Sequence, residues 1–452
     1  MGMAIATAFD SEVEAASISD SFKLTSQAKY ASTESRATGF ASDVALTGSL
    51  GGTMTINSTA MAKSVATGFD GDLQAAAVSD KFKLTVTAKS EVYSAEAQGF
   101  AATDFTNGLS GKINVSAVSK TGDASALGGN LSSEYTFRTA TANTFAVTAQ
   151  SQNSATATGL AGDGGDVELK GALAVQAKGV DSTAYGINAN SGALTGYIGL
   201  TGAVAAVGNT ATGVSGGDAS WFTVNGGLYA GNKGSAAGIA KSLGKLVGTG
   251  KSAAGLNKNA DQAISLGSNS TLTINDGSIV IGDVSLGADS TLEISTGAQL
   301  YGDIDMSGSG TLNIYIGGSL TKAATVTLDS AGAGVFTTSS GVTLTVTATE
   351  LTETGSYVLL AGSDLSEISD DYDTLFGLVD FDTYGLDASW VLDQSGKTDT
   401  LTLVLSQEPV GSSSALLSAT DLNSVDRMLA SSSFVEESAT SNANAWKNAL
   451  IA

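Results

Sequence analysis

Apolar and polar residues alternate with a period of two in many short stretches of this chain. The alternation is clear in Phe22–Thr25, Phe82–Val86 and Ile113–Ala117, and it runs from Val167 to Ala177 with charged or small residues between the apolar ones. Successive side chains of a β-strand point to opposite faces, so this period is typical of strands with one buried and one exposed face. These stretches therefore predict β-strands rather than helices.

The strand-like stretches belong to longer repeats. Ala6–Lys29 matches Ala66–Lys89 at 14 of 24 positions, and repetition of this kind is typical of stacked, solenoid folds. A shorter motif, Ala-Thr-Gly followed by an aromatic or aliphatic residue, is interpreted as a turn that recurs every 27 to 33 residues. Its last residue falls at Phe9, Phe40, Phe69, Phe100, Leu127, Leu160, Ile187 and Val214. Residues 1–262 are therefore predicted to form irregular rungs of this length.

In residues 263–330 the repeat shortens to twenty residues. Ser270–Ile274 returns as Ser290–Ile294 and again as Gly310–Ile314, and Ile279–Ile281 fits between the first two copies as a further apolar run. A second apolar pair keeps the same spacing at Ile264 and Leu266, at Val284 and Leu286, and at Ile304 and Met306. Three short strands per repeat describe one rung of a parallel β-helix. An even repeat also keeps the same residues inside from one rung to the next.

Composition supports the same fold class, which is all-β with a right-handed parallel β-helix, or β-solenoid. The chain has 56 glycines, which suit tight corners, and its single proline, Pro409, follows the repeats. Aromatic residues make up only 6% of the chain, as expected for a narrow core of small aliphatic side chains. The two ends of such a solenoid expose strand edges, which favour association with other strands unless they are covered.

Residues 331–408 lose the repeat but keep strand-like stretches. These are Val342–Thr347, Tyr357–Leu360, Trp390–Leu392 and Leu401–Leu405. We interpret this segment as a cap on the C-terminal end of the β-helix. Its acidic turn Asp370–Asp373 offers oxygen ligands for calcium but lacks the spacing of an EF-hand, so a solvated turn is favoured. Residues 409–452 are predicted to form a polar linker and a short terminal α-helix, from the helical spacing of apolar residues in Leu422–Leu429.

Charge and missing residue types exclude several classes of function. The net charge is −23, which repels a phosphate backbone and makes nucleic acid a poor partner. The chain has no cysteine and no histidine, so it cannot form disulfides, thiolate or imidazole metal sites, or Ser-His-Asp and Cys-His catalytic arrangements. We therefore expect no enzyme activity, no cofactor, and no catalytic or metal-binding residues.

One basic segment interrupts this acidity. Lys233–Lys258 carries five lysines, and no acidic residue lies between Asp218 and Asp261. We interpret the segment as a solvated loop or short helix on the solenoid, with a patch for an anionic ligand as the alternative. The start of the chain, Met1–Asp10, lacks the basic and apolar regions of a signal peptide and lies within a repeat, which indicates an excised fragment.

Several of these features together resemble the passenger domain of a Gram-negative autotransporter (type V secretion). They are the glycine- and Ser/Thr-rich rungs, a terminal block containing Gly355–Leu360 and Thr400–Leu403, and the linker Gly411–Ser414 before a helix. The resemblance implies that the terminal block assists folding outside the cell. It also implies that the helix lies in or near the pore of a translocator β-barrel, which would follow Ala452. Protease passengers of this family use Ser-His-Asp, which this chain cannot form.

We therefore expect a non-catalytic structural or adhesive β-helix that is secreted or displayed at the outer membrane. Its expected partners are a host cell surface, matrix or glycan, other copies of itself and, in the full-length protein, the translocator barrel. Two alternatives stay open, a β-helix that degrades polysaccharides with paired carboxylates and an ice- or mineral-binding solenoid. Thr273, Glu293 and Asn313 differ at equivalent outward positions, which disfavours the lattice match that ice binding requires.

Overall fold

The computed structural model describes most of the repeats and part of the segment that follows them. The described residues are 2–105, 107–132, 135–162, 166–189, 197–253, 255–256, 260–295, 297–307, 310–316, 326–327, 336–338, 343–348, 355–365, 379–380 and 386–407. The chain divides into two compact units, which are Met1–Tyr384 with Ala388–Leu405, and Gly385–Asp387 with Ser406–Ala452. The predicted terminal helix and the acidic turn Asp370–Asp373 lie outside the described residues.

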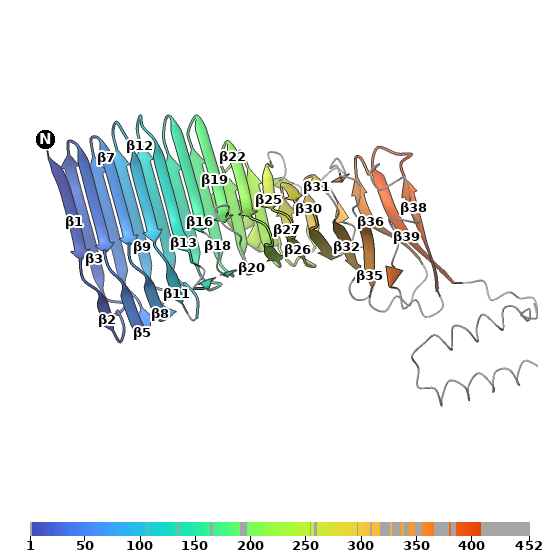
Figure 1. Ribbon diagram of the computed structural model, residues 1–452, viewed down its shortest axis with the longest axis horizontal. Coiled ribbons are helices and arrows are strands. Elements are labelled where there is room, and N and C mark those ends of the chain that lie inside the picture. The colour runs from blue at the N-terminus through green and yellow to red at the C-terminus, as the bar shows by residue number, and fades with distance from the viewer. Residues whose placement is uncertain are drawn as a thin grey trace, which may run out of the picture. The chain divides into compact units, whose positions relative to one another are not determined.

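The first unit is a parallel β-helix, which confirms the predicted fold class (Figure 1). Strands that follow one another in the chain belong to different sheets, and each strand pairs with parallel strands of the neighbouring rungs. Sheet A forms one side of the rungs and sheet C another. The third side is sheet B in the first four rungs and sheet D in the later ones.

Sheets A and B account for the first two strands of each early rung. Sheet A contains β1 (Met3–Phe9), β4 (Glu34–Phe40), β7 (Lys63–Phe69), β10 (Ala95–Phe100), β13 (Ala124–Leu131), β16 (Ser154–Gly162), β19 (Asp181–Ala189), β22 (Thr210–Gly216), β25 (Gln262–Leu266), β28 (Asp283–Leu286), β31 (Ile304–Met306) and β34 (Phe336–Thr338). Sheet B contains β2 (Val13–Ala15), β5 (Val44–Leu50), β8 (Leu73–Val78) and β11 (Thr103–Phe105).

Sheets C and D complete the rungs. Sheet C contains β3 (Lys23–Ala31), β6 (Thr53–Ala60), β9 (Lys83–Ser90), β12 (Lys112–Ser119), β15 (Thr144–Gln150), β18 (Ala172–Lys178), β21 (Ala203–Val207), β24 (Gly227–Gly231), β27 (Ile279–Ile281) and β30 (Gln299–Tyr301). Sheet D contains β14 (Phe137–Thr139), β17 (Val167–Leu169), β20 (Tyr197–Leu200), β23 (Trp221–Val224), β26 (Thr271–Ile274), β29 (Thr291–Ser295), β32 (Thr311–Ile316), β35 (Thr343–Ala348) and β37 (Val379–Asp380).

Stacked phenylalanines fill the core beside sheet A in the first rungs. Phe9, Phe40, Phe69 and Phe100 lie in register, and their ring centroids are 4.7, 5.0 and 5.5 Å apart along the stack. Each phenylalanine is the last residue of its strand and pairs with the next one in the column. The Ala-Thr-Gly motif is therefore part of a strand, and its interpretation as a turn is wrong.

The fifth position of this column is Gly129, because Phe100 pairs with Gly129. The prediction that Leu127 is the equivalent residue is therefore wrong by two positions, and Leu127 lies on the outer side of its strand. Side chains from the other sheets occupy the space that Gly129 leaves. Phe137 lies 3.6 Å from the Cβ position of Gly129, and Phe145 meets Phe100 edge-on at 6.3 Å. The column continues through Leu160, Ile187, Val214 and Ile264.

A second column, of glycines, lies one residue before the first. It comprises Gly39, Gly68, Gly99, Gly128, Gly159, Gly186 and Gly213. A Cβ atom on each of these glycines would lie 2.2–2.5 Å from a backbone carbonyl oxygen of the next rung. No side chain fits at such a distance without separating the rungs. Close backbone approach therefore explains why glycine recurs in the motif.

The twenty-residue rungs form as predicted. Leu272, Leu292 and Leu312 pair in register and are at most 1% exposed, so their inward assignment is confirmed. The glycine column ends here at Ala263. The register shifts at this point, because Gln262 pairs with Asp283 and Ile264 pairs with Val284. No residue of β28 therefore lies opposite Ala263, which leaves room for its Cβ atom.

The long strand predicted from Val167 to Ala177 is instead two strands, β17 and β18, which belong to different sheets. A corner at Lys170 and Gly171 separates them. A Cβ atom on Gly171 would lie 2.6 Å from the carbonyl oxygen of Asn143, so the chain bends tightly against the preceding rung. The alternation continues through the corner because both strands point apolar side chains into the same core.

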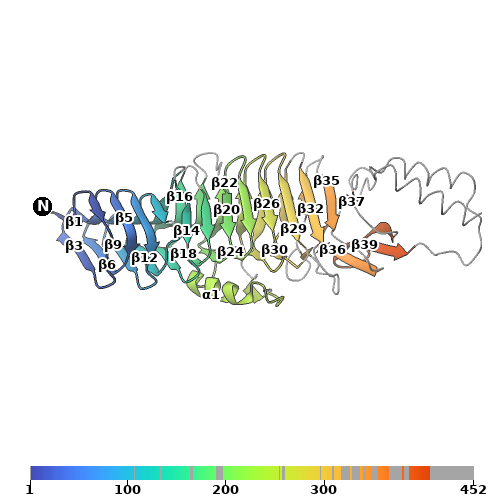
Figure 2. The ribbon, with the colours of Figure 1, turned by 90° about the horizontal axis from the view of Figure 1, so that it is seen from below.

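The basic segment contains helix α1 (Ala236–Leu246), which confirms the helical alternative for it. The Oγ atom of Ser235 accepts a hydrogen bond from the backbone N–H of Gly238, which caps the helix. Its apolar side packs on the outer face of sheet C in a cluster separate from the main core (Figure 2). The buried members include Ala236, Ala240 and Leu243 of the helix, and Ala205, Tyr229 and Tyr301 of the sheet.

A sheet with a different pattern follows the rungs. It contains β33 (Val326–Thr327), β36 (Gly355–Gly362), β39 (Asp399–Gln407) and β38 (Leu386–Asp393). β36 pairs with β39 in the antiparallel direction, whereas β33 pairs with β36 in parallel. The strands predicted at Val342–Thr347, Tyr357–Leu360, Trp390–Leu392 and Leu401–Leu405 correspond to β35, β36, β38 and β39. The capping role of this segment stays a prediction.

Candidate binding face on sheet D

The outer face of sheet D carries aligned polar and aromatic side chains. Tyr197 pairs with Trp221, Trp221 with Thr271, and the register continues through Thr291 to Thr311. Neighbouring parallel strands are about 4.8 Å apart, so these outward residues form a straight column along the solenoid. We call it the Trp221 column.

An aromatic pair lies at one end of this column. The rings of Tyr197 and Trp221 meet edge-on, with centroids 6.1 Å apart and an interplanar angle of 89°. Trp221 is 57% exposed, which is unusual for so large an apolar side chain. An exposed indole on a flat, rigid sheet offers a stacking surface at low entropic cost, because the strand backbone on both sides is fixed.

Hydrogen-bonding groups lie beside the Trp221 column. The next outward column contains Thr223, Thr273, Glu293 and Asn313. The Oγ1 atom of Thr273 donates a hydrogen bond to Oε2 of Glu293 at 3.0 Å, which holds the carboxylate against the sheet. The outer face of sheet D, which we call face D, therefore combines an exposed aromatic surface with hydroxyl, carboxylate and amide groups. This combination can bind a polar ligand.

Three aspartates stack at a corner of the short rungs, where β25, β28 and β31 begin. They are Asp261, Asp283 and Asp303. Burial raises the pKa of Asp283, and the charges of Asp303 and Asp261 raise it further, although a hydrogen bond from the backbone N–H of Asp303 at 2.9 Å opposes the shift. A carboxyl group whose pKa is raised beside other carboxylates is one feature of enzymes that hydrolyse glycosides. The polysaccharide-degrading alternative stays a prediction, to be tested by changing Asp283 and Asp303 to asparagine.

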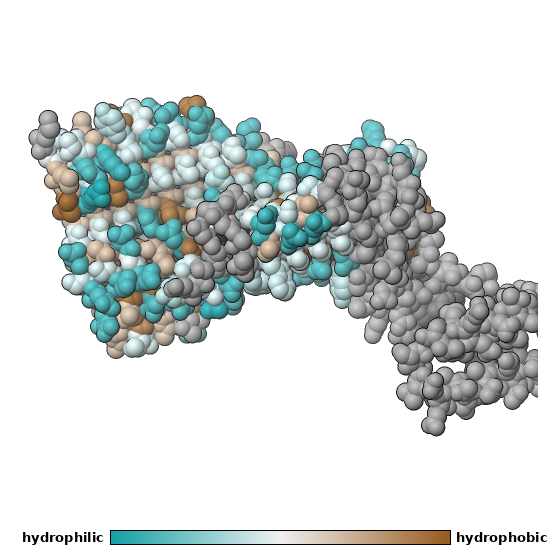
Figure 3. Space-filling model, in the orientation of Figure 1, coloured by the Kyte–Doolittle hydropathy of each residue, from teal (hydrophilic) through white to brown (hydrophobic). Residues whose placement is uncertain are grey.

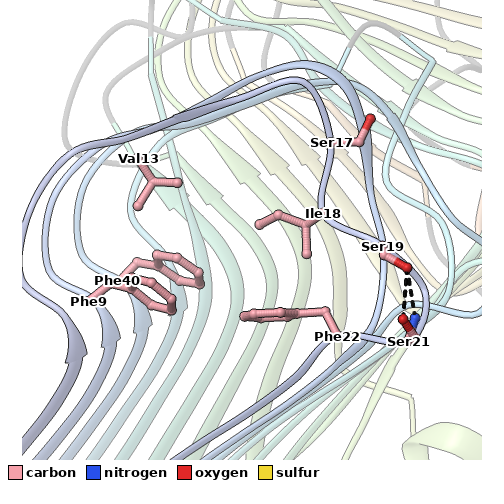
Figure 4. A pocket seen from close by; sticks show the side chains of 8 residues that line it. All are labelled: Phe9, Val13, Ser17, Ile18, Ser19, Ser21, Phe22 and Phe40. Carbon is pink, nitrogen blue, oxygen red and sulfur yellow. Dashed lines mark hydrogen bonds between the residues drawn. The ribbon is translucent and has the colours of Figure 1, made fainter.

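A hollow of about 360 Å³ opens at the N-terminal end of the β-helix (Figure 4). The stacked rings of Phe9 and Phe40 form one wall, and Val13, Ile18 and Phe22 face them. The same end of the molecule shows hydrophobic surface in the space-filling view (Figure 3). Its lining is the apolar core of the first rung, and it presents no titratable side chain. This hollow is therefore the open end of the core rather than a site for chemistry.

The described part of the chain offers neither a metal site nor a membrane-spanning helix. Within it, no three acidic, histidine or cysteine side chains are grouped so that they could hold a metal ion. No helix there combines the length and the hydropathy needed to cross a membrane. The acidic turn Asp370–Asp373 is outside this part of the chain.

Comparison with known proteins adds no relative to this description. No protein family, no curated protein and no solved structure matches the chain. The fold alone therefore defines the class of the protein, which is a parallel β-solenoid.

The sequence contained a signal for face D that its interpretation missed. Thr271, Thr291 and Thr311 recur at the second position of the repeated stretch Ser270–Ile274, whereas the position two residues later varies among rungs. Trp221 precedes the regular repeats, so no spacing placed it in the same column. Its alignment with Thr271 follows from the pairing of β23 with β26 across the helical insertion.

Proposed function

We propose that this protein is a non-catalytic adhesive solenoid, secreted or displayed at the surface of a Gram-negative bacterium in the manner of an autotransporter passenger. The observation that supports adhesion is the exposed Trp221 with its column of aligned threonines on sheet D. The expected ligands are glycans or matrix components of a host surface.

The chemistry of face D fits a sugar ligand. The faces of pyranose rings carry C–H groups that pack on an indole, while the hydroxyl groups at the ring edge need donors and acceptors. Thr271 and Thr291 offer hydroxyls in the same column as Trp221, and Glu293 offers acceptors beside them. Tryptophan and tyrosine are also the side chains that most often dominate binding energy at protein surfaces.

The test is binding of the full chain to host cells, to matrix proteins and to an array of neutral glycans. Trp221→Ala is expected to weaken binding at least tenfold, since anchor tryptophans contribute about 2 kcal/mol or more. Tyr93→Ala is the matched control, because Tyr93 is an exposed aromatic residue (65%) in a turn after β9, away from sheet D. Equal binding by wild type and Trp221→Ala would contradict a role of face D in adhesion.

Surface display needs its own test. Antibodies against the full chain are expected to label intact cells of the native bacterium and to detect the protein in the culture medium or on the outer membrane. Labelling only after the cells are permeabilised would contradict an extracellular role.

Ice or mineral binding is a second candidate, which the uniform column of Thr271, Thr291 and Thr311 favours. A crystal surface must be matched in two dimensions, however, and the neighbouring column alternates among Thr273, Glu293 and Asn313. Adhesion is therefore the better supported role. If solutions of the full chain show thermal hysteresis and the Thr291→Leu variant does not, ice binding would be the better supported function.

A further inference from the structure

Basic residues are segregated on one side of the β-helix. The ten strands of sheet C contain six lysines and no aspartate or glutamate, although the chain as a whole has a net charge of −23. All six lysines are exposed. They are Lys23, Lys29, Lys83, Lys89, Lys112 and Lys178. We call the outer face of these strands face C.

The lysines of face C make no ion pair in the part of the chain that the structure describes. The basic residues in strands of the other sheets behave differently. Arg36 and Lys63 of sheet A lie 2.8 and 2.9 Å from Glu34 and Glu96, and Arg138 of sheet D lies 3.5 Å from a glutamate. The charges of face C are therefore not used to balance acids of the same chain, and they are accessible to a ligand.

Register arranges these charges in two columns. Lys23, Thr53, Lys83 and Lys112 follow one another in adjacent strands, which puts Lys83 and Lys112 side by side at about 4.8 Å between strands. Like charges that are direct neighbours in a sheet are destabilising. Lys29 and Lys89 belong to a second column, six residues further along their strands, or about 20 Å away.

Hydrogen-bonding side chains fill the space between the lysine columns. One intervening column contains Thr25, Thr55, Thr85 and Asn114, and the other contains Gln27, Asn57, Thr87 and Ser116. None of the large apolar side chains that the described residues expose belongs to a strand of sheet C. Face C is therefore flat, cationic and able to donate and accept many hydrogen bonds.

Helix α1 extends the positive charge along the same face. The helix packs over β18, β21 and β24, and Lys241 and Lys245 on it are exposed (Figure 2). Lys233 and Lys251 flank it and are exposed as well. The cationic path therefore runs from β3 to β24, which is eight strands of sheet C or about 34 Å.

We propose that face C binds a linear acidic polysaccharide through its lysine columns. A polyanion with carboxylate or sulfate groups at regular intervals matches a straight cationic path, and its hydroxyl groups match the threonine, asparagine and glutamine columns. A bilayer is a poorer fit because none of the exposed large apolar side chains of the described residues lies on a strand of sheet C. Duplex DNA is a poorer fit because a broad flat sheet does not enter a groove and the rest of the surface is acidic. This proposal does not depend on the ligand of face D.

The experiment measures binding of the full chain to two probes, heparin and polygalacturonate, with neutral dextran as the reference polymer. Wild type is expected to bind at least one acidic probe, with an affinity that falls as salt rises, and not dextran. The variant Lys83→Gln/Lys112→Gln is expected to bind about tenfold more weakly or worse, since each lysine near a polyanionic surface contributes to affinity. Its melting temperature should be equal or higher, because two neighbouring like charges are removed.

A matched control carries the same change in net charge on other sheets. Lys63→Gln/Arg138→Gln removes two paired basic residues from sheets A and D, and its heparin affinity should stay within about twofold of wild type. An equal loss in both double variants would show a non-specific charge effect and overturn the assignment of face C. Absence of binding to both acidic polymers would overturn it as well.

Two further measurements distinguish other partners for the same face. Tighter binding to vesicles containing phosphatidylserine or to duplex DNA than to either polymer would overturn the polysaccharide assignment. Self-association of wild type in sedimentation velocity that Lys83→Gln/Lys112→Gln abolishes would assign face C to a second copy instead. Unchanged heparin binding by Trp221→Ala is expected, and it separates this proposal from the adhesive role of face D.

Discussion

The close contacts of the glycine column predict how much an added side chain would lower the stability of the protein. Gly99→Ala would place a Cβ atom 2.4 Å from the carbonyl oxygen of Gly128 and 3.0 Å from Cγ2 of Val115. Removing this clash requires the two rungs to move apart by roughly 1 Å. That displacement is large compared with the range of lengths that a backbone hydrogen bond between strands allows. The backbone N–H of Asn130, in the rung of Gly128, donates to the carbonyl of Ala101 at 3.0 Å just beyond this point, so this hydrogen bond should be weakened.

Two effects add to give the expected magnitude. Overpacking a filled core costs about 1–3 kcal/mol, and a weakened buried hydrogen bond costs about 1 kcal/mol or more. Alanine also reduces the entropy of the unfolded chain, which offsets about 0.4–1 kcal/mol. We therefore expect Gly99→Ala to lower the free energy of unfolding by about 1–4 kcal/mol.

The control is the same substitution where space is open. Gly244 lies in α1, and a Cβ atom there would meet nothing within 4 Å, so Gly244→Ala should stabilise the protein by about 0.5–1 kcal/mol. Repeat proteins can unfold in steps, so hydrogen exchange of β7, β10 and β13 amides should accompany urea titration. Protection of the Asn130 amide equal to wild type, with no loss of stability in Gly99→Ala, would refute the reasoning.

Three other changes test the core and the corner aspartates. Phe69→Ala removes a ring stacked on both sides and should cost about 3–5 kcal/mol, whereas Phe9→Ala at the open end should cost less than half as much in the same urea titration. Leu292→Asp puts a charge at a fully buried position and should unfold the short rungs; a wild-type circular dichroism spectrum and melting temperature would contradict this. Asp283→Asn keeps the acceptor for the N–H of Asp303. Burial and neighbouring carboxylates raise the pKa of Asp283 in the folded state above its ordinary value of 3.8. Ionisation of Asp283 therefore destabilises the folded state as the pH rises above 3.8. The melting temperature of Asp283→Asn should exceed that of wild type near neutral pH, and the difference should shrink as the pH falls below 3.8.

The short rungs could be predicted from the sequence because their repeat length is constant. Leu272, Leu292 and Leu312 are twenty residues apart, so equal spacing and spatial register coincide. In the long rungs the two differ. Gly129 replaces an aromatic residue in its column, and a search for aromatic or aliphatic residues after glycine therefore selected Leu127. Only the pairing of the strands identifies the position without a side chain and the phenylalanines of the other sheets that occupy its space.

The binding faces were harder to predict for a related reason. The members of an outward column such as Lys23, Thr53, Lys83 and Lys112 are separated in sequence by 30, 30 and 29 residues, and a threonine interrupts the three lysines. Buried columns are constrained by packing and therefore recur, whereas outward residues are free to vary. Segregation of lysine on sheet C becomes visible only when every strand has been assigned to its sheet.

Faces C and D should act independently, because each rung of a solenoid contacts only its neighbours. Lys83 and Lys112 lie in β9 and β12, whereas Trp221 lies in β23 on another sheet, at least four rungs or about 19 Å further along. Substitutions at such separations usually have additive effects. The triple variant should therefore lose heparin binding by the factor of the lysine pair and host-surface binding by the factor of Trp221→Ala. A triple variant in which either loss differs severalfold from its single-face value would mean that one ligand spans both faces, and the two sites would then have to be treated as one.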